Sequence, residues 1–163
     1  MRVLGVDPGL TRCGVAVVDG DRGRSPRLVA SVVLTSSATA HHPQRLLQIW
    51  EELNALVEVH HPDAVAVEEV FSQQNVRSVM GTAQVAGLVM VCAQRRGLPL
   101  GSHTPTEVKA SVTGHGRANK DQVTRMVMRL LDLQQRPQPA DAADAMALAI
   151  CHIWRSGPVG VRR

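Results

Sequence analysis

The sequence predicts an α/β domain built on a mixed β-sheet. Three β-rich runs, at residues 2–7, 13–18 and 27–34, follow one another with only short turns between them, which indicates an antiparallel meander. An amphipathic helical pattern over 43–60 then leads to the short, fully apolar run 64–68. Strands of that kind are usually covered on both faces and pair in parallel. Together these patterns favour antiparallel strands extended by parallel ones.

The connections in the first half have the chemistry of turns. Residues 8–12 begin with Pro8 and Gly9 and join the first two runs as a hairpin. Residues 19–26 are a polar stretch before the third run. The long helix is expected to end at His61, because the proline that follows has no amide hydrogen to donate.

The second half of the chain is predicted to be mainly helical. Thr104 with Glu107, and Asn119 with Gln122, have the capping-box spacing that marks the start of a helix. The expected elements are helices over 76–96, 105–112, 120–132 and 140–155, with a further edge strand over 98–103. We expect one domain over residues 1–156, followed by a flexible basic tail over 157–163.

Small residues recur along the predicted helix 76–96. They are Gly81, Ala83, Ala86, Gly87 and Ala93. Small side chains let a second helix approach closely, so we interpret this helix as a candidate dimer interface.

Composition narrows the possible classes of protein. The chain has 163 residues, 44% of them hydrophobic and 20% charged, which is typical of a globular domain. Its net charge of +4 points to a polyanionic partner. Three cysteines without metal-like spacing predict a reducing compartment. No apolar run approaches the roughly 20 residues of a membrane span, so we expect a cytoplasmic protein with no membrane partner.

Four carboxylates stand at the ends of the predicted elements. Asp7 closes the first strand and Glu68 closes the apolar strand, while Asp141 and Asp144 share one face of the last helix. Like charges repel, and burying them is costly, so a site that gathers several acids usually holds a divalent cation. Oxygen ligands of this kind suit Mg²⁺ or Mn²⁺, and paired ions of that type catalyse phosphoryl transfer.

Each acid also has a simpler interpretation when it is taken alone. Asp7 precedes Pro8-Gly9 and fits a turn residue. Asp141 fits a helix cap, and Asp144 fits an acid in the first turn, where the helix dipole favours negative charge. Glu68 is harder to explain in this way, because it ends a wholly apolar strand.

Longer segments of the chain resemble a known family. They are GVDPGLTRCGVAVVD (5–19), AVAVEEVFSQQN (64–75), PTEVKASVTGHGRANKDQV (105–123) and QPADAADAMALAICH (138–152). In order and spacing they resemble the RuvC family of crossover-junction endodeoxyribonucleases, which have a ribonuclease H-like fold. The resemblance implies a homodimer that resolves Holliday junctions by paired symmetric nicks in DNA recombination and repair. It also implies action alongside the branch-migration proteins RuvA and RuvB.

The resemblance assigns roles to residues at matching positions. It places the catalytic, metal-binding acids at Asp7, Glu68, Asp141 and Asp144, holding two Mg²⁺ ions per site, with Mn²⁺ able to substitute. Phe71 matches an aromatic residue that stacks on junction bases. The alternative is a core residue, but the polar stretch 72–75 that follows favours the functional interpretation. Lys109 and Lys120 match basic residues near the cleaved strand. Arg77 and Arg117 are further DNA-binding candidates, and any of these cations could simply be solvated.

Two rival functions remain at this point. The strand–Asp–Gly–Thr hairpin at residues 5–11 is also typical of actin-like ATPases and sugar kinases. Those proteins need two such lobes to enclose a nucleotide, and this chain is long enough for one. The second rival is a protein that binds branched DNA without cutting it. An acidic tetrad disfavours that function, because carboxylates that face DNA weaken binding unless a metal ion neutralises them.

Overall fold

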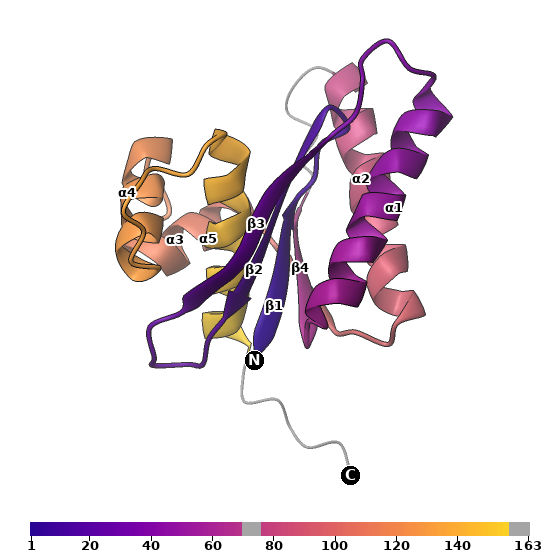
Figure 1. The fold of residues 1–163 in the computed structure, drawn as a ribbon. Coiled ribbons are helices and arrows are strands. Elements are labelled where there is room, and N and C mark those ends of the chain that lie inside the picture. Colours follow the sequence, from indigo (N-terminus) through magenta and orange to yellow (C-terminus); the bar gives the residue numbers. More distant parts are fainter. Residues whose placement is uncertain (70–75, 157–163) are drawn as a thin grey trace.

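The computed structural model describes residues 1–69 and 76–156. They form three layers, with one sheet between two helices on one face and three on the other (Figure 1). The strands are β1 (Arg2–Asp7), β2 (Arg12–Asp19), β3 (Arg27–Thr35), β4 (Ala64–Glu68) and β5 (Leu100–His103). The helices are α1 (His42–His60), α2 (Val76–Arg95), α3 (Pro105–Thr113), α4 (Lys120–Leu130) and α5 (Ala140–Arg155).

The sheet has the mixed topology that the sequence predicts. Its strand order is β3-β2-β1-β4-β5, in which the first three strands are antiparallel. β4 pairs parallel with β1, and β5 pairs parallel with β4. Val6 lies opposite Val67 in the central pair, so the next residues, Asp7 and Glu68, leave neighbouring strands at the same edge.

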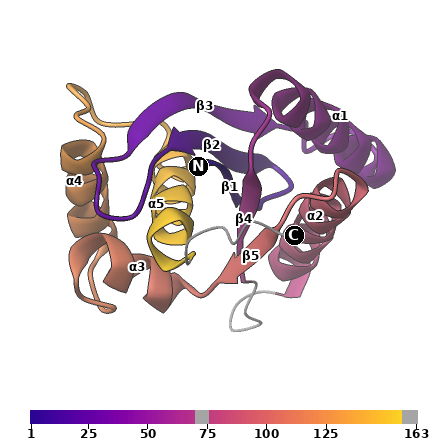
Figure 2. The same ribbon diagram turned by 90° about the horizontal axis from the view of Figure 1, so that it is seen from below.

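Helix α5 forms the centre of one face of the sheet and packs mainly on β1 and β2 (Figure 2). Its residues from Ala145 to Ile153 are all buried. Two glycines permit this close approach. A Cβ atom at Gly5 would meet the backbone of Ala145, and one at Gly14 would collide with the carbonyl oxygen of Asp141. The first turn of α5 is therefore held directly against the sheet.

The ends of the elements follow local chemistry. Both predicted capping boxes are present, with Thr104 and Asn119 as N-caps of α3 and α4. α4 ends at Leu130, two residues earlier than expected, and Asp132 beyond it has the left-handed φ of 51°. β5 begins at Leu100 rather than at residue 98, because Leu98 turns into the core beside α2 instead of pairing.

The small residues of α2 do not all face the same way. Ala86 and Ala93 are buried in the core beneath the helix, and a Cβ atom at Gly81 would press on the side chain of Leu10. These three residues let α2 approach its own domain. Only Ala83 and Gly87 of the predicted set remain at least partly exposed.

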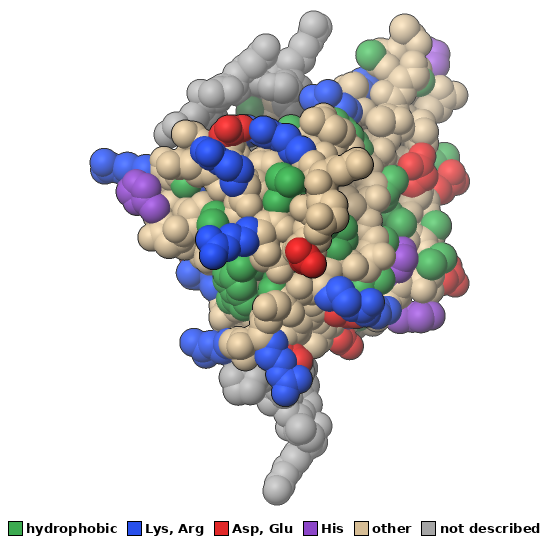
Figure 3. All heavy atoms as spheres, turned by 60° about the vertical axis from the view of Figure 1, so that its left-hand side comes forward, with side chains coloured by type: hydrophobic (Ala, Val, Ile, Leu, Met, Phe, Trp, Pro, Cys, Tyr) green, Lys and Arg blue, Asp and Glu red, His purple; other side chains and the backbone are tan. Residues whose placement is uncertain are grey.

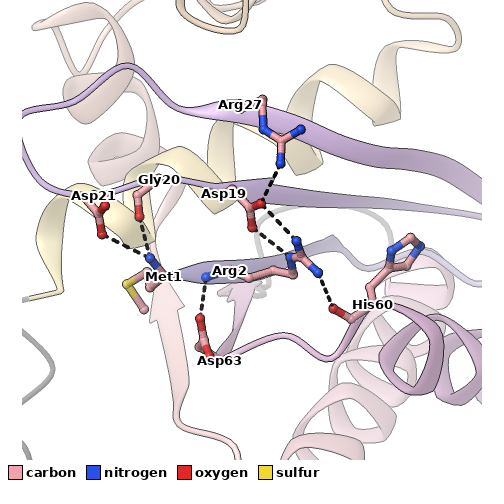
Figure 4. Close-up of polar contacts among 8 residues, drawn as sticks. All are labelled: Met1, Arg2, Asp19, Gly20, Asp21, Arg27, His60 and Asp63. Carbon is pink, nitrogen blue, oxygen red and sulfur yellow. Dashed lines mark hydrogen bonds and ion pairs between the residues drawn. The ribbon is translucent and has the colours of Figure 1, made fainter.

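A polar network connects the elements at the end of the sheet where β1 begins and β2 ends (Figure 4). The Arg2 guanidinium donates two hydrogen bonds to the Asp19 carboxylate, at 2.8 and 3.0 Å, and a third to the carbonyl of His60. Arg27 also pairs with Asp19, and the amide of Arg2 donates to Asp63. These contacts join β1, β2 and β3 to the end of α1.

No helix among residues 1–69 and 76–156 is long and apolar enough to cross a membrane.

Candidate active site

The predicted acids gather at the edge of the sheet where β1 and β4 end. Alternate residues of these strands, such as Gly5 and Ala66, pack towards α5, so Asp7 and Glu68 point to that same face. Asp7, Glu68 and Asp144 line a cavity of about 180 Å³. The other lining residues are Pro105, Val108, Lys109, Lys120, Val123 and Ala147. Asp141 lies beside the cavity, where the backbone of α5 meets Gly14.

Burial makes the charge of this site unfavourable. Burial, together with the negative charges of Glu68, Asp144 and Asp141, raises the pKa of Asp7 from 3.8 to about 7. The pKa of Glu68 is also raised, mainly by burial and then by Asp144. Asp7 is therefore not a solvated turn residue. Clustered, desolvated carboxylates of this kind need a cation close by.

Two basic side chains supply part of that positive charge. Lys120 donates a hydrogen bond to Asp144, with 3.1 Å between Nζ and Oδ2, which raises the pKa of the lysine. Arg12 forms an ion pair with Asp141, with 3.3 Å between Nε and Oδ2. Asp141 does not cap its helix, because the N-cap position is Pro139 and no side chain caps there. The interpretation of Asp141 as a helix cap is therefore wrong, although Asp141 does lie in the first turn of α5, where the helix dipole favours negative charge.

The donor set of the site fits Mg²⁺ or Mn²⁺. It consists of carboxylate oxygens, the ligands that these hard cations prefer, and a divalent ion would relieve the repulsion that raises the pKa of Asp7. Within the described ranges, no three Asp, Glu, His or Cys side chains stand close enough to enclose an ion as they are oriented here. Metal ligation by Asp141 and Asp144 would compete with the ion pairs that these acids make with Arg12 and Lys120.

The predicted DNA-binding residues have different positions. Lys109 and Lys120 line the cavity itself. Arg117 is exposed in the α3–α4 loop and does not line the cavity. Phe71 and the side chain of Arg77 lie outside the described residues. Figure 3 shows Lys and Arg side chains spread over the side of the molecule where α3 and α4 lie, with acidic side chains fewer among them.

Arg12 is a further member of this site that the sequence motifs did not indicate. It is the first residue of β2, and its side chain lies on the α5 face because Gly14, two residues later, also meets α5. Residues two apart on a strand point to the same face of the sheet, so the signal in the sequence was the position of Arg12 two residues before Gly14. His103 and His152 form a buried pair that the sequence pattern did not predict either, with 3.0 Å between Nε2 and Nδ1.

A family model described as crossover junction endodeoxyribonuclease RuvC matches residues 3–152. The chain belongs to the RuvC family. A RuvC from Saccharopolyspora erythraea is 56% identical over 160 residues, which cover 98% of this chain and 80% of the relative. A RuvC from Nocardioides is 60% identical over 157 residues, which cover 96% of this chain and 89% of the relative.

Solved structures agree with that assignment. RuvC from T. thermophilus in complex with a Holliday junction substrate has a TM-score of 0.89 and 33% identity, and the match covers 94% of this chain and 93% of that one. The yeast mitochondrial Holliday junction resolvase Ydc2, at 17% identity and a TM-score of 0.64, shares the fold over 94% of this chain and 78% of that one. Membership of RuvC, a ribonuclease H-like nuclease family, confirms the predicted fold and separates the chain from the ATPases and sugar kinases.

Proposed function

We propose that this chain is a structure-selective endonuclease that resolves four-way DNA junctions by paired symmetric nicks. The observation that carries the proposal is the pair of half-buried carboxylates, Asp7 and Glu68, that end adjacent parallel strands opposite the acidic first turn of α5. Family membership supports the substrate, since the relatives are crossover junction endodeoxyribonucleases. Recombination and repair of DNA are the processes that such a reaction serves.

We assign metal binding to the four acids. Asp7 has the central position, because its carboxylate interacts electrostatically with each of the other three. Two bound Mg²⁺ ions, or Mn²⁺ in their place, would activate water and stabilise the leaving 3′ oxygen, so that the products carry a 5′ phosphate and a 3′ hydroxyl. No side chain needs to act as the nucleophile.

Other side chains of the cavity would position the DNA. Lys109 and Lys120 line the same cavity as the acids, and their ammonium groups suit the phosphates on either side of the cleaved bond. Val108, Val123 and Ala147 make part of the wall apolar, which limits the water that reaches the site. Phe71 remains a candidate for stacking on an unpaired base, and Arg77 and Arg117 for more distant phosphates.

The protein should act as a homodimer, because two symmetric nicks need two sites related by a two-fold axis. α2 carries an exposed apolar stripe that suits the contact. Met80 and Met90 are 58% and 44% exposed, and Ala83 and Gly87 lie between them at helical spacing. A Cβ atom at Gly87 would meet no atom within 4 Å, so a second helix can approach there. Action beside RuvA and RuvB in the cytoplasm is part of the same proposal.

Cleavage of a synthetic four-way junction tests this function. We expect paired nicks in Mg²⁺ or Mn²⁺, no cleavage of a linear duplex of the same sequence, and no nicking by Asp7→Asn. The control variant Asp19→Asn changes an acid at the far end of the sheet and should cut normally. Tight junction binding without nicking, with every metal and junction sequence tested, would instead show a protein that binds branched DNA without cutting it.

A further inference from the structure

We propose that Arg12 is a phosphate-binding residue of this site, which exchanges its ion pair with Asp141 for a DNA phosphate when Asp141 ligates metal. The inference rests on the proposed metal-dependent cleavage. It adds to Lys109 and Lys120 a third cation, which comes from the sheet instead of from α3 or α4.

The ion pair itself is suited to exchange. The Arg12 side chain is 60% exposed and that of Asp141 is 22% exposed, so the guanidinium lies on the solvent side of the carboxylate. An exposed pair of this kind contributes little to stability and is screened by salt. A divalent ion carries twice the charge of a guanidinium and would displace it from the same carboxylate oxygen. The displaced guanidinium keeps a fork of N–H donors that matches the geometry of a phosphate.

The backbone on which Arg12 stands is held in place. Arg45 of α1 donates to Thr11 Oγ1 at 2.8 Å and to Ser36 Oγ at 3.0 Å. The amide of Ser36 donates to the carbonyl of Thr11 at 3.2 Å, and its hydroxyl donates to the carbonyl of Leu10. The turn before Arg12 is therefore clamped from the α1 side. Exchange of partners is then a movement of the Arg12 side chain on a fixed backbone.

Each of the two acids near the start of α5 has one basic partner. Asp141 faces Arg12 from β2, and Asp144 faces Lys120 from α4. The two cations thus approach the acids from different elements. A DNA backbone that enters the cavity between β2 and α4 would have a basic side chain on each side of the cleaved bond.

Two measurements on Arg12→Gln test the proposal. Calorimetric titration of the DNA-free protein with Mn²⁺ should show binding about 2–5-fold tighter than in the wild type, because a competing cation is gone. The single-turnover rate of junction cleavage at saturating protein and metal should fall on the order of 10-fold, the contribution of one charged hydrogen bond. Arg12→Lys should recover much of the rate. The control Arg27→Gln breaks an Arg–Asp pair at the far end of the sheet and should change neither quantity.

The outcomes separate the possible roles. Weaker metal binding together with a lower melting temperature in Arg12→Gln would make Arg12 a structural residue and overturn the proposal. Unchanged cleavage would overturn it as well, since no phosphate contact would have been lost. If the wild type itself neither binds Mn²⁺ nor cuts junctions, the proposed function fails and this inference fails with it. If the wild type binds Mn²⁺ and cuts junctions, and Arg12→Gln does both equally well, only the inference about Arg12 is refuted.

Discussion

The buried charge of Asp7 should destabilise the folded protein in the absence of metal. Its pKa is raised from 3.8 to about 7, so the folded state holds a proton that the unfolded state has released over this interval. The destabilisation is absent below pH 3.8, grows as pH rises, and is complete above pH 7. At 1.36 kcal/mol per pH unit it reaches about 4 kcal/mol at pH 8 and about 2 kcal/mol at pH 5.

Asp7→Asn removes that charge and should raise the free energy of unfolding by these amounts. The assay is denaturant unfolding of both proteins in EDTA at pH 5 and pH 8. A gain of about 4 kcal/mol corresponds to a rise in melting temperature of roughly 8–16 °C for a domain of this size. Added Mg²⁺ should stabilise the wild type more than Asp7→Asn, because the ion neutralises the charge that the variant lacks.

Asp19→Asn is the matched control, because Asp19 has the opposite shift. Its hydrogen bond from Arg2 lowers the pKa of the carboxyl, so this substitution should destabilise the protein at pH 8 and matter less in acid. An Asp7→Asn variant that is less stable than the wild type, or whose gain is the same at both pH values, would refute the account of Asp7 as a desolvated, repelled carboxylate.

Three further predictions concern the interface, the docking of α5 and the buried histidine pair. Met90→Glu should convert the dimer to a monomer in sedimentation experiments, whereas Val59→Glu, at an exposed position of α1, should leave it dimeric; a dimeric Met90→Glu would remove α2 from the interface. Gly14→Ala should destabilise the protein by about 1–3 kcal/mol and slow cleavage, since the new methyl meets the backbone of α5, whereas Gly87→Ala should leave the fold intact; equal stability of the two would contradict this packing. Burial lowers the pKa of His152 from 6.5 to about 4, so the unfolded state binds a proton that the folded state does not bind over this interval. The Asp7→Asn variant, in which Asp7 no longer titrates, should therefore lose about 3 kcal/mol of stability as pH falls from 6.5 to 4. A flat stability profile over that range would contradict this prediction.

The placement of Asp7 and Glu68 could be predicted because it depends on local patterns. Two short apolar runs define two buried strands, and the residue that ends each strand stands at a sheet edge whatever the exact register. The caps at Thr104 and Asn119 are equally local, since donor and acceptor lie three residues apart. Such features need no knowledge of the tertiary packing.

The rest of the site depends on how α5 docks, which the sequence does not specify locally. Arg12 meets Asp141 only because Gly5 and Gly14 let the helix lie directly on β1 and β2. Which small residues of α2 face the sheet also depends on tertiary packing. A recurring alanine pattern indicates close contact but not whether the partner is the sheet, as at Ala86, or another molecule.

The central claim is that Asp7, Glu68, Asp141 and Asp144 together hold two metal ions. Anomalous diffraction from crystals of the protein with Mn²⁺ and junction DNA, grown with Asp7 intact, would test it most directly. We expect two peaks roughly 4 Å apart, both within ligating distance of the Asp7 carboxylate, and the Arg12 guanidinium turned from Asp141 towards a phosphate. A single peak held by α5 alone, or no peak at Asp7, would contradict the claim.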